Sequence, residues 1–226
     1  MESKNMIVAG HQPNYLPWLG FFHKMKNCDV FTIEDNLQFV YREFHNRNRI
    51  KTPNGVQWLT VPVHDGRTHR PICDVKICND IKWQRKHWLT LQSSYGRAPY
   101  WHEYEDFFKE TYNKEWTRLI DLNLHLIRGI MNFLKIKTKL VFASELGVSG
   151  KKNELILAQL KALGADTLLS GTGALNYLDF KRFKDEGIKV IIQDFKHPVY
   201  TQLWGDFVTN LSVVDFLFCT GGKQSF

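Results

Sequence analysis

The 226-residue chain lacks the features that mark several specialised classes of protein. It has four cysteines, too few for a disulfide-stapled miniprotein, and no pair shows the spacing of a zinc knuckle or redox motif. No apolar run approaches the roughly 18 residues of a membrane span, and the opening MESKNMIVAGHQP contains only the short run MIVA. We therefore expect a cytoplasmic protein with reduced thiols, no membrane span and no metal site.

Apolar and basic side chains are plentiful instead. Hydrophobic residues make up 43% and aromatic residues 14%, which excludes disorder and predicts a cleft with aromatic walls. Thirty Lys and Arg against 23 Asp and Glu give a formal net charge of +7. This surplus favours an anionic partner: a phosphorylated small molecule, a nucleic acid or a lipid headgroup. The signal is weak, because the basic residues are spread along the chain with no block of about five or six. We rank nucleic acid last, because basic and aromatic residues do not alternate as a single-strand groove needs.

Short apolar runs near the start predict the beginning of a parallel α/β unit. Strands are expected over 6–9 and 29–34, separated by a loop at 11–17 and a helix at 18–26. A polar loop follows, and then a hairpin over 50–63 that turns at Pro53-Asn54-Gly55.

Further along, the apolar periodicity predicts helices first and then strands that alternate with helices. The expected helices cover 81–94, 100–112, 115–134, 151–163, 180–186 and 211–219, and the expected strands cover 138–143, 167–169 and 188–193. We predict one α/β domain over residues 1–226, with a mostly parallel, Rossmann-like (nucleotidyltransferase-like) sheet and a helical insertion at about 81–134.

The first candidate site is the loop after the first strand, which carries His11, Gln12, Asn14 and Tyr15. Ligands bind at the carboxyl ends of parallel strands, where loops converge and helix N-termini face anions. His11 suits a general base, and its three neighbours supply hydrogen bonds for a sugar or amide. The alternative is that His11 only ties the loop to the backbone.

A second candidate, the basic segment, contains Tyr41, Arg42, Asn46, Arg47 and Lys51. Arg forks bind phosphate or carboxylate with two hydrogen bonds, so converging cations here would make an anion subsite. We expect this segment and His11 to lie at one cleft. A solvated basic loop is the alternative.

Ser170, Gly171, Gly173 and Tyr177 form a third candidate, the glycine loop after a short strand. Its two glycines allow close backbone approach and an amide nest for an anion. Ordinary turn chemistry explains the same residues equally well.

The first loop is similar, in part, to the Gly- and His-containing loop that HxGH-type nucleotidyltransferases place between their first strand and first helix. His11 stands for the first histidine of that motif, whereas Gly20 is followed by Phe21 where the second histidine is needed. A shared architecture follows from this likeness, and adenylyl transfer does not.

Longer stretches resemble the WbqC-like protein family. They are HQPNYLPWLGFFHKM, DVFTIEDNLQF, NRNRIKTPNGVQWLTVPV, KHW, SSYGRAPYW, SGTGALNYLD and YTQLWGDFVTNLSVVDFLFCTGG. The resemblance implies a place in bacterial surface-polysaccharide biosynthesis, O-antigen clusters included. It supplies no catalytic residue and no cofactor.

From residues and resemblance together, we predict a transferase acting on a nucleotide-linked amino sugar, with acyl or aminoacyl transfer as the reaction class. The basic segment would hold the diphosphate and His11 would deprotonate the attacking amine. Two alternatives remain: a nucleotidyltransferase-like nucleotide-binding enzyme or regulator, and a nucleic-acid-binding module.

Overall fold

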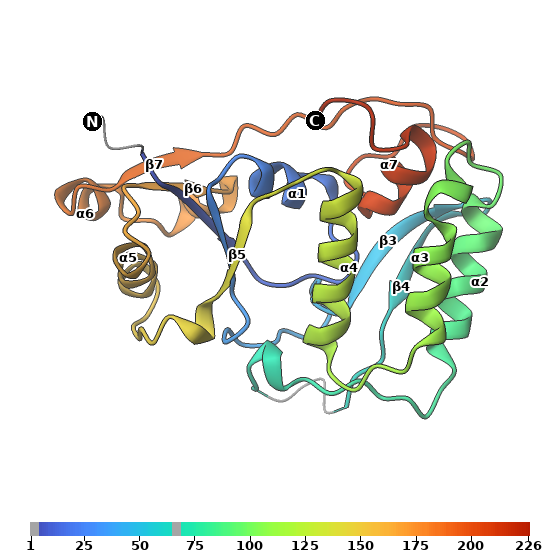
Figure 1. Cartoon of the computed structure of the whole chain (residues 1–226), viewed down its shortest axis with the longest axis horizontal. Coiled ribbons are helices and arrows are strands. Elements are labelled where there is room, and N and C mark those ends of the chain that lie inside the picture. The colour runs from blue at the N-terminus through green and yellow to red at the C-terminus, as the bar shows by residue number, and fades with distance from the viewer. Residues whose placement is uncertain (1–4, 65–68) are drawn as a thin grey trace.

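A five-stranded sheet forms the centre of the protein in the computed structural model, which describes residues 5–64 and 69–226. Its strands are all parallel, which confirms the predicted α/β class. They stand in the order β5 (Lys139–Phe142), β2 (Val30–Ile33), β1 (Ile7–His11), β6 (Thr167–Ser170) and β7 (Lys189–Ile192) (Figure 1).

Alternating side chains of these strands build a separate apolar core on each face of the sheet. Ala9, Phe31 and Leu169 point to one face, where they pack with helices α1 (Leu19–Lys26) and α4 (Leu119–Phe133). Their strand neighbours Val8, Val30 and Leu168 point to the other face, toward α5 (Asn153–Ala162) and α6 (Phe180–Asp185). The period of two along each strand therefore produces a three-layer arrangement.

The direction of winding changes at β1. The chain runs from β1 to β2 and β5 on one side, and then returns to place β6 and β7 on the other side. The connections that leave β1 and β6 therefore diverge, and a crevice opens between the carboxyl ends of these two strands.

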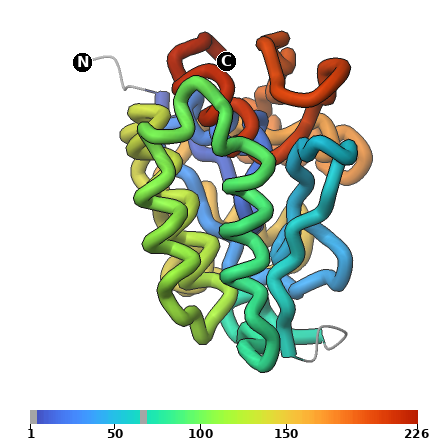
Figure 2. Tube along the Cα trace, turned by 90° about the vertical axis from the view of Figure 1, so that its right-hand side faces the viewer, coloured from blue at the N-terminus to red at the C-terminus, as the bar shows by residue number. Residues whose placement is uncertain are grey.

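A second, two-stranded sheet lies beside the helical middle of the chain. It is the antiparallel hairpin of β3 (Arg47–Thr52) and β4 (Gly55–Thr60), and it turns at the predicted Pro53-Asn54-Gly55, where Gly55 has a φ of +99°. Figures 1 and 2 show it alongside α2 (Trp83–Tyr95), with α3 (Trp101–Asn113) beyond. Short 3₁₀ turns lie at Ile72–Asp74, Ala143–Glu145 and Thr172–Asn176, and α7 (Val213–Thr220) is the last helix.

Several element boundaries differ from the sequence prediction, among them the hairpin, which begins at Arg47 and ends at Thr60 and not at residues 50 and 63. The helix expected from residue 115 begins at Leu119, because the residues before it pair in extended form with residues 76–77, where Ile77 N–H donates to the Thr117 carbonyl at 2.9 Å. The first strand continues to His11, which was expected in the loop, because β1 stays paired with β2 up to His11, opposite Ile33. Among the described residues, no helix has the length and apolar character needed to cross a bilayer.

One buried amide connects the helical middle to the loops beside the sheet. The side-chain NH₂ of Asn123, on α4, donates to the Pro13 carbonyl at 3.0 Å and to the His45 carbonyl at 2.8 Å. Both acceptors are backbone groups of loops that have no strand partner at these atoms. We infer that Asn123 fixes the spacing of the two loops.

Replacing Asn123 with alanine should therefore lower the free energy of unfolding by about 2–4 kcal/mol, because two buried carbonyls lose their donor. Asn132→Ala, at an exposed position of the same helix, is the matched control and should stay within about 0.5 kcal/mol of wild type. Urea unfolding measures both. Equal stabilities of the two variants would contradict the role given to Asn123.

Candidate functional site

A cavity of about 540 Å³ lies at the crevice between β1 and β6. This volume is within the range of roughly 300–1,000 Å³ found for small-molecule sites. The sheet supplies one wall and α5 supplies another. The polar or charged side chains in its lining are His11, Gln12, Lys24, Thr32, Glu34, Lys152, Gln159, Ser170 and Tyr177.

His11 stands at the end of β1 with a fixed ring. Its Nδ1–H donates to the Gln12 carbonyl at 2.9 Å, and the ring meets the edge of Phe21 at 5.2 Å between centroids. Burial, with the nearby positive charge of Lys24, lowers the pKa of His11 to about 3. The imidazole is thus neutral at neutral pH, with its proton on Nδ1 and a lone pair on Nε2.

Gln12 is oriented by a second histidine. His45 accepts the Val40 N–H on Nδ1 at 3.2 Å, so its Nε2–H is free to donate to Gln12 Oε1 at 3.0 Å. Burial lowers the pKa of His45 to about 4, which keeps this ring neutral too. Because the amide oxygen of Gln12 faces His45, its NH₂ end is the donor that remains for a ligand.

Lys24 and Glu34 bring opposite charges to the same cavity. Lys24 is buried, and its Nζ donates to the Gly10 carbonyl at 3.0 Å. Burial lowers the pKa of Lys24 to about 8, so most of the amine remains charged at neutral pH. Burial raises the pKa of Glu34, whose two oxygens accept hydrogen bonds from Thr32 Oγ1 at 2.7 Å and Gln159 Nε2 at 2.9 Å.

Gly10 makes room for this arrangement. A Cβ atom at Gly10 would lie 2.3 Å from Thr32 Oγ1 and 2.7 Å from Glu34 Oε1, both far inside van der Waals contact. Only glycine lets the Glu34 carboxylate and its Thr32 partner sit against the end of β1. The missing side chain is therefore part of the site.

The glycine loop closes the cavity from the side of β6. All four of its predicted residues line the cavity: Ser170, Gly171, Gly173 and Tyr177. Lys152, directly before α5, lines it as well. The structure thus brings together the glycine loop and two members of the first loop, His11 and Gln12, although 160 residues of chain separate them.

The other two members of the first loop lie outside this lining. Asn14 is buried, and Tyr15 is fully buried with its hydroxyl bonded to His87 Nδ1 at 2.8 Å and to the Tyr112 hydroxyl at 2.5 Å. These contacts join the loop to α2 and α3. Their roles in ligand binding stay predictions.

None of the five residues predicted from the basic segment lines the cavity. Tyr41 and Arg42 are exposed, and Arg47 lies over the Trp58 ring at 4.1 Å on the hairpin. The Asn46 side chain donates to the Val61 carbonyl at 2.8 Å. The expectation that this segment and His11 line one cleft is therefore wrong for the cavity.

Lys51, the fifth of these residues, belongs to a buried network around α7. Its Nζ donates to Gln202 Oε1 at 3.1 Å and to the Gly205 and Asp206 carbonyls. Asp215 accepts hydrogen bonds from Tyr95, Tyr200 and Gln202 in the same network, and burial raises its pKa. With every Lys51 donor directed to protein oxygens, this lysine has a structural role.

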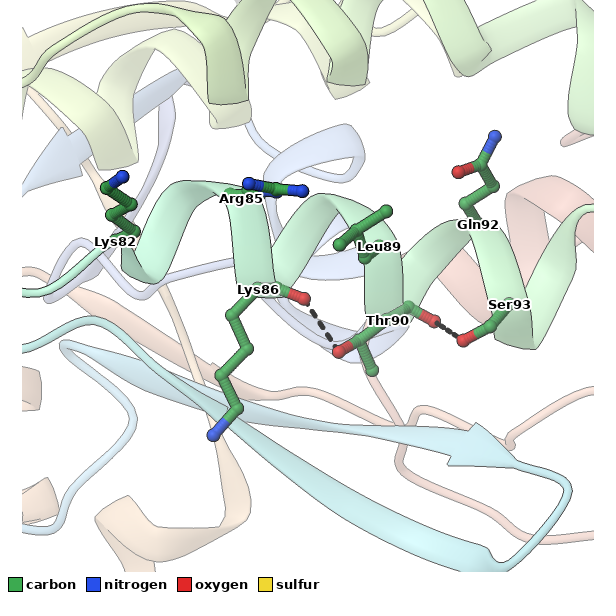
Figure 3. A pocket seen from close by; sticks show the side chains of 7 residues that line it. All are labelled: Lys82, Arg85, Lys86, Leu89, Thr90, Gln92 and Ser93. Atoms are coloured by element: carbon green, nitrogen blue, oxygen red, sulfur yellow. Dashed lines mark hydrogen bonds between the residues drawn. The ribbon is translucent and has the colours of Figure 1, made fainter.

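A larger hollow of about 650 Å³ lies elsewhere, over the outer side of α2 (Figure 3). All of its lining residues come from Lys82 to Ser93, one helix and the residue before it. A single helix cannot enclose a ligand, so this hollow is open surface. Among residues 5–64 and 69–226, no three His, Cys, Asp or Glu side chains gather as a metal site requires.

Sequence reasoning did not select Lys24, Glu34 or Gln159 for the site. A signal existed for two of them. Glu34 directly follows the strand next to β1, and Lys24 lies three residues after Phe21, on the helix side that faces the sheet. A charged residue at a buried position of a periodic pattern is the mark to look for.

Comparison with known proteins gives a coherent result. The model of the WbqC-like protein family matches residues 12–225. The chain belongs to this family. A relative in Mycobacterium tuberculosis (strain ATCC 25618 / H37Rv), the uncharacterized protein Rv1507c, is 35% identical over 219 residues, which cover 96% of this chain and 94% of that protein. No solved structure gives a significant match to this WbqC-like chain.

The crowding at Gly10 predicts the effect of adding one methyl group. Gly10→Ala should lower the free energy of unfolding by about 1–3 kcal/mol, because Glu34 or the backbone of β1 must shift. Gly171→Ala is the matched control, with no atom within 4 Å of its Cβ and an ordinary φ of −76°. Thermal or urea unfolding measures both, and a Gly10→Ala protein as stable as the Gly171→Ala protein would contradict the crowding.

The low pKa of His11 predicts a change in acid stability. Between about pH 3 and pH 6.5 the unfolded chain binds a proton that folded His11 does not, so this residue removes stability as the pH falls through that window. His11→Gln should therefore lose less stability than wild type between pH 7 and pH 4, with a slope smaller by up to about one proton. Urea unfolding across this range provides the test, and parallel curves would contradict the burial of a neutral ring.

Proposed function

We propose that this WbqC-like protein is a transferase that binds a nucleotide-linked amino sugar and moves an acyl or aminoacyl group onto its amine. The observation that carries the proposal is the cavity at the β1–β6 crevice, which joins a buried lysine, a half-buried glutamate and two loops rich in hydrogen-bond donors. The association of the WbqC-like family with surface-polysaccharide biosynthesis supports a glycan precursor as the substrate.

The glycine loop and two lysines would bind the diphosphate of the nucleotide-linked sugar. Gly171 and Gly173 leave their backbone amides open to close approach, and Lys24 and Lys152 add positive charge. Gln12 and Tyr177 offer hydrogen bonds to the sugar hydroxyls. These groups take the part first predicted for the basic segment.

The transfer step needs a proton acceptor beside the attacking amine. The amine nitrogen forms a bond to the acyl carbon, and the donor's leaving group departs with the electrons of the bond that breaks. Glu34 accepts the amine proton and returns it to the leaving group, since a carboxylate of raised pKa is a better base near neutrality than an imidazole of pKa about 3. His11 Nε2 accepts a hydrogen bond from the amine and orients it.

A nucleotidyltransferase-like enzyme is the second candidate. It is favoured by one observation, the crevice beside His11 at the point where the strand order reverses. The incomplete HxGH pattern in the sequence weighs against adenylyl transfer. A ligand panel separates the two candidates: stabilisation by ATP or CTP with magnesium, in preference to nucleotide sugars, favours the second.

The proposed roles predict different effects at three positions. In a panel of UDP- and dTDP-linked amino sugars with acyl donors, Glu34→Gln should retain ligand-induced thermal stabilisation and lose turnover by about 10²-fold or more. Lys24→Met should weaken ligand binding by about 1.5–3 kcal/mol, the contribution of a charged hydrogen bond.

Arg47→Ala provides the control, because it removes a cation that does not line the cavity. Its ligand binding and turnover should match wild type. Mass spectrometry of the sugar product measures turnover, and a thermal shift measures binding. Loss of binding in Arg47→Ala with full binding in Lys24→Met would place the ligand on the hairpin and overturn the assignment.

A further inference from the structure

The hairpin and the outer side of α2 collect most of the large apolar side chains that face solvent. Eleven such side chains are exposed among the described residues, and seven of them belong to these two elements or to the residues just before each. They are Val40, Tyr41, Phe44, Val56, Trp58, Ile81 and Leu89, each 38–58% exposed. Clusters of this kind on a protein surface mark interaction sites.

The same two regions have a local surplus of positive charge that nearly equals the net charge of the whole chain. Residues 36–60 and 81–95 contain seven Lys and Arg and one carboxylate, Glu43, a surplus of six in a protein whose net charge is +7. Six of these cations form no ion pair with a described carboxylate: Arg42, Arg47, Arg49, Lys82, Arg85 and Lys86. The surplus is therefore not neutralised within the described structure.

Shared contacts make these side chains one continuous surface. A groove of about 350 Å³ is lined by Trp58 from the hairpin and by Ile81, Lys82 and Lys86 from the start of α2. Lys82 and Lys86 also border the open hollow over α2, where Leu89 lies (Figure 3).

On its other side, Trp58 lies 5.7 Å from Phe44 between ring centroids and under the guanidinium of Arg47. Arg47 in turn donates to the Arg42 carbonyl. The basic–apolar surface is our name for the surface that these contacts connect, which contains Arg42, Phe44, Arg47, Trp58, Ile81, Lys82, Lys86 and Leu89.

We propose that the basic–apolar surface docks the protein onto a bilayer that contains anionic lipids. Aromatic rings at the level of the headgroups, aliphatic side chains beside them and unpaired Arg and Lys are the chemistry that holds peripheral proteins to such bilayers. A single-stranded nucleic acid would use the rings and the cations but gains nothing from the aliphatic side chains of Ile81 and Leu89. The proposal is independent of the reaction in the cavity, because no residue of this surface lines it.

Flotation with vesicles tests the proposal directly. The full-length protein should bind vesicles of 70% phosphatidylcholine and 30% phosphatidylglycerol, should bind pure phosphatidylcholine vesicles far less, and should dissociate as the salt concentration rises. Neutralising two cations in Lys82→Gln/Lys86→Gln should weaken binding about 25-fold, at about fivefold for each basic residue near a charged bilayer. Ile81→Ser/Leu89→Ser should weaken it as well.

Matched variants elsewhere on the surface serve as controls. Lys181→Gln/Lys184→Gln removes two exposed cations from α6, and Val199→Ser removes an exposed apolar side chain. Both should bind vesicles like wild type. Equal losses in the α2 and α6 variants would show attraction by net charge alone and overturn the proposal, as would absence of vesicle binding. Binding of a 20-nucleotide dT strand in place of vesicles, at about 150 mM salt, would assign the surface to nucleic acid.

Discussion

The site depends on the close approach of β2 to β1 at Gly10. Parallel pairing places Gly10 opposite Thr32, and the absence of a Cβ lets the Thr32 hydroxyl and the Glu34 carboxylate occupy the space above the strand. Lys24 reaches the carbonyl of the same glycine from α1. One residue without a side chain thus gathers a carboxylate, a hydroxyl and an ammonium group at the end of the central strand.

Burying these charges opposes folding unless each has partners. Glu34 has two neutral donors, Thr32 and Gln159, and Lys24 has a backbone acceptor, but the two charges form no direct ion pair in the structure. Partial compensation of this kind shifts both pKa values toward the neutral forms. Groups shifted in this way are typical of sites where a ligand or a reaction completes the set of partners.

Much of the architecture was predictable, because it follows from local patterns. The alternation of short apolar runs with amphipathic stretches predicts the parallel sheet, and Pro53-Asn54-Gly55 fixes the hairpin turn. The start of α4 was not predictable in the same way. Trp116 continues the helical spacing, yet its neighbours pair with residues 76–77, a contact that local sequence does not encode.

The residues of the site were likewise only partly predictable from local sequence. His11, Gln12 and the glycine loop follow strands directly, so the rule that ligands bind at carboxyl ends of strands finds them. Glu34 also follows a strand directly, although it was not selected, whereas Lys24 joins the site only because α1 lies against the end of β1. The prediction that the basic segment lines the same cleft as His11 was wrong, because a dense run of cations indicates an anion-binding surface but does not determine where that surface lies in the fold. Arg47 and Lys51 lie four residues apart on β3, with Arg49 between them at the same alternation, yet one lies on Trp58 and the other is enclosed by the chain near Gln202.

The loop from Val40 to His45 has a consequence for communication within the molecule. Its first residues are exposed beside the hairpin, whereas His45 bonds both to the Val40 amide and to the Gln12 side chain of the cavity. A single imidazole therefore joins the basic–apolar surface to the β1–β6 crevice through two hydrogen bonds. If His45 itself is displaced, Gln12 loses the donor that orients its amide, so the NH₂ group that faces the cavity is no longer fixed. By thermodynamic reciprocity, a ligand that holds Gln12 in place must favour one arrangement of the surface loop to the same degree.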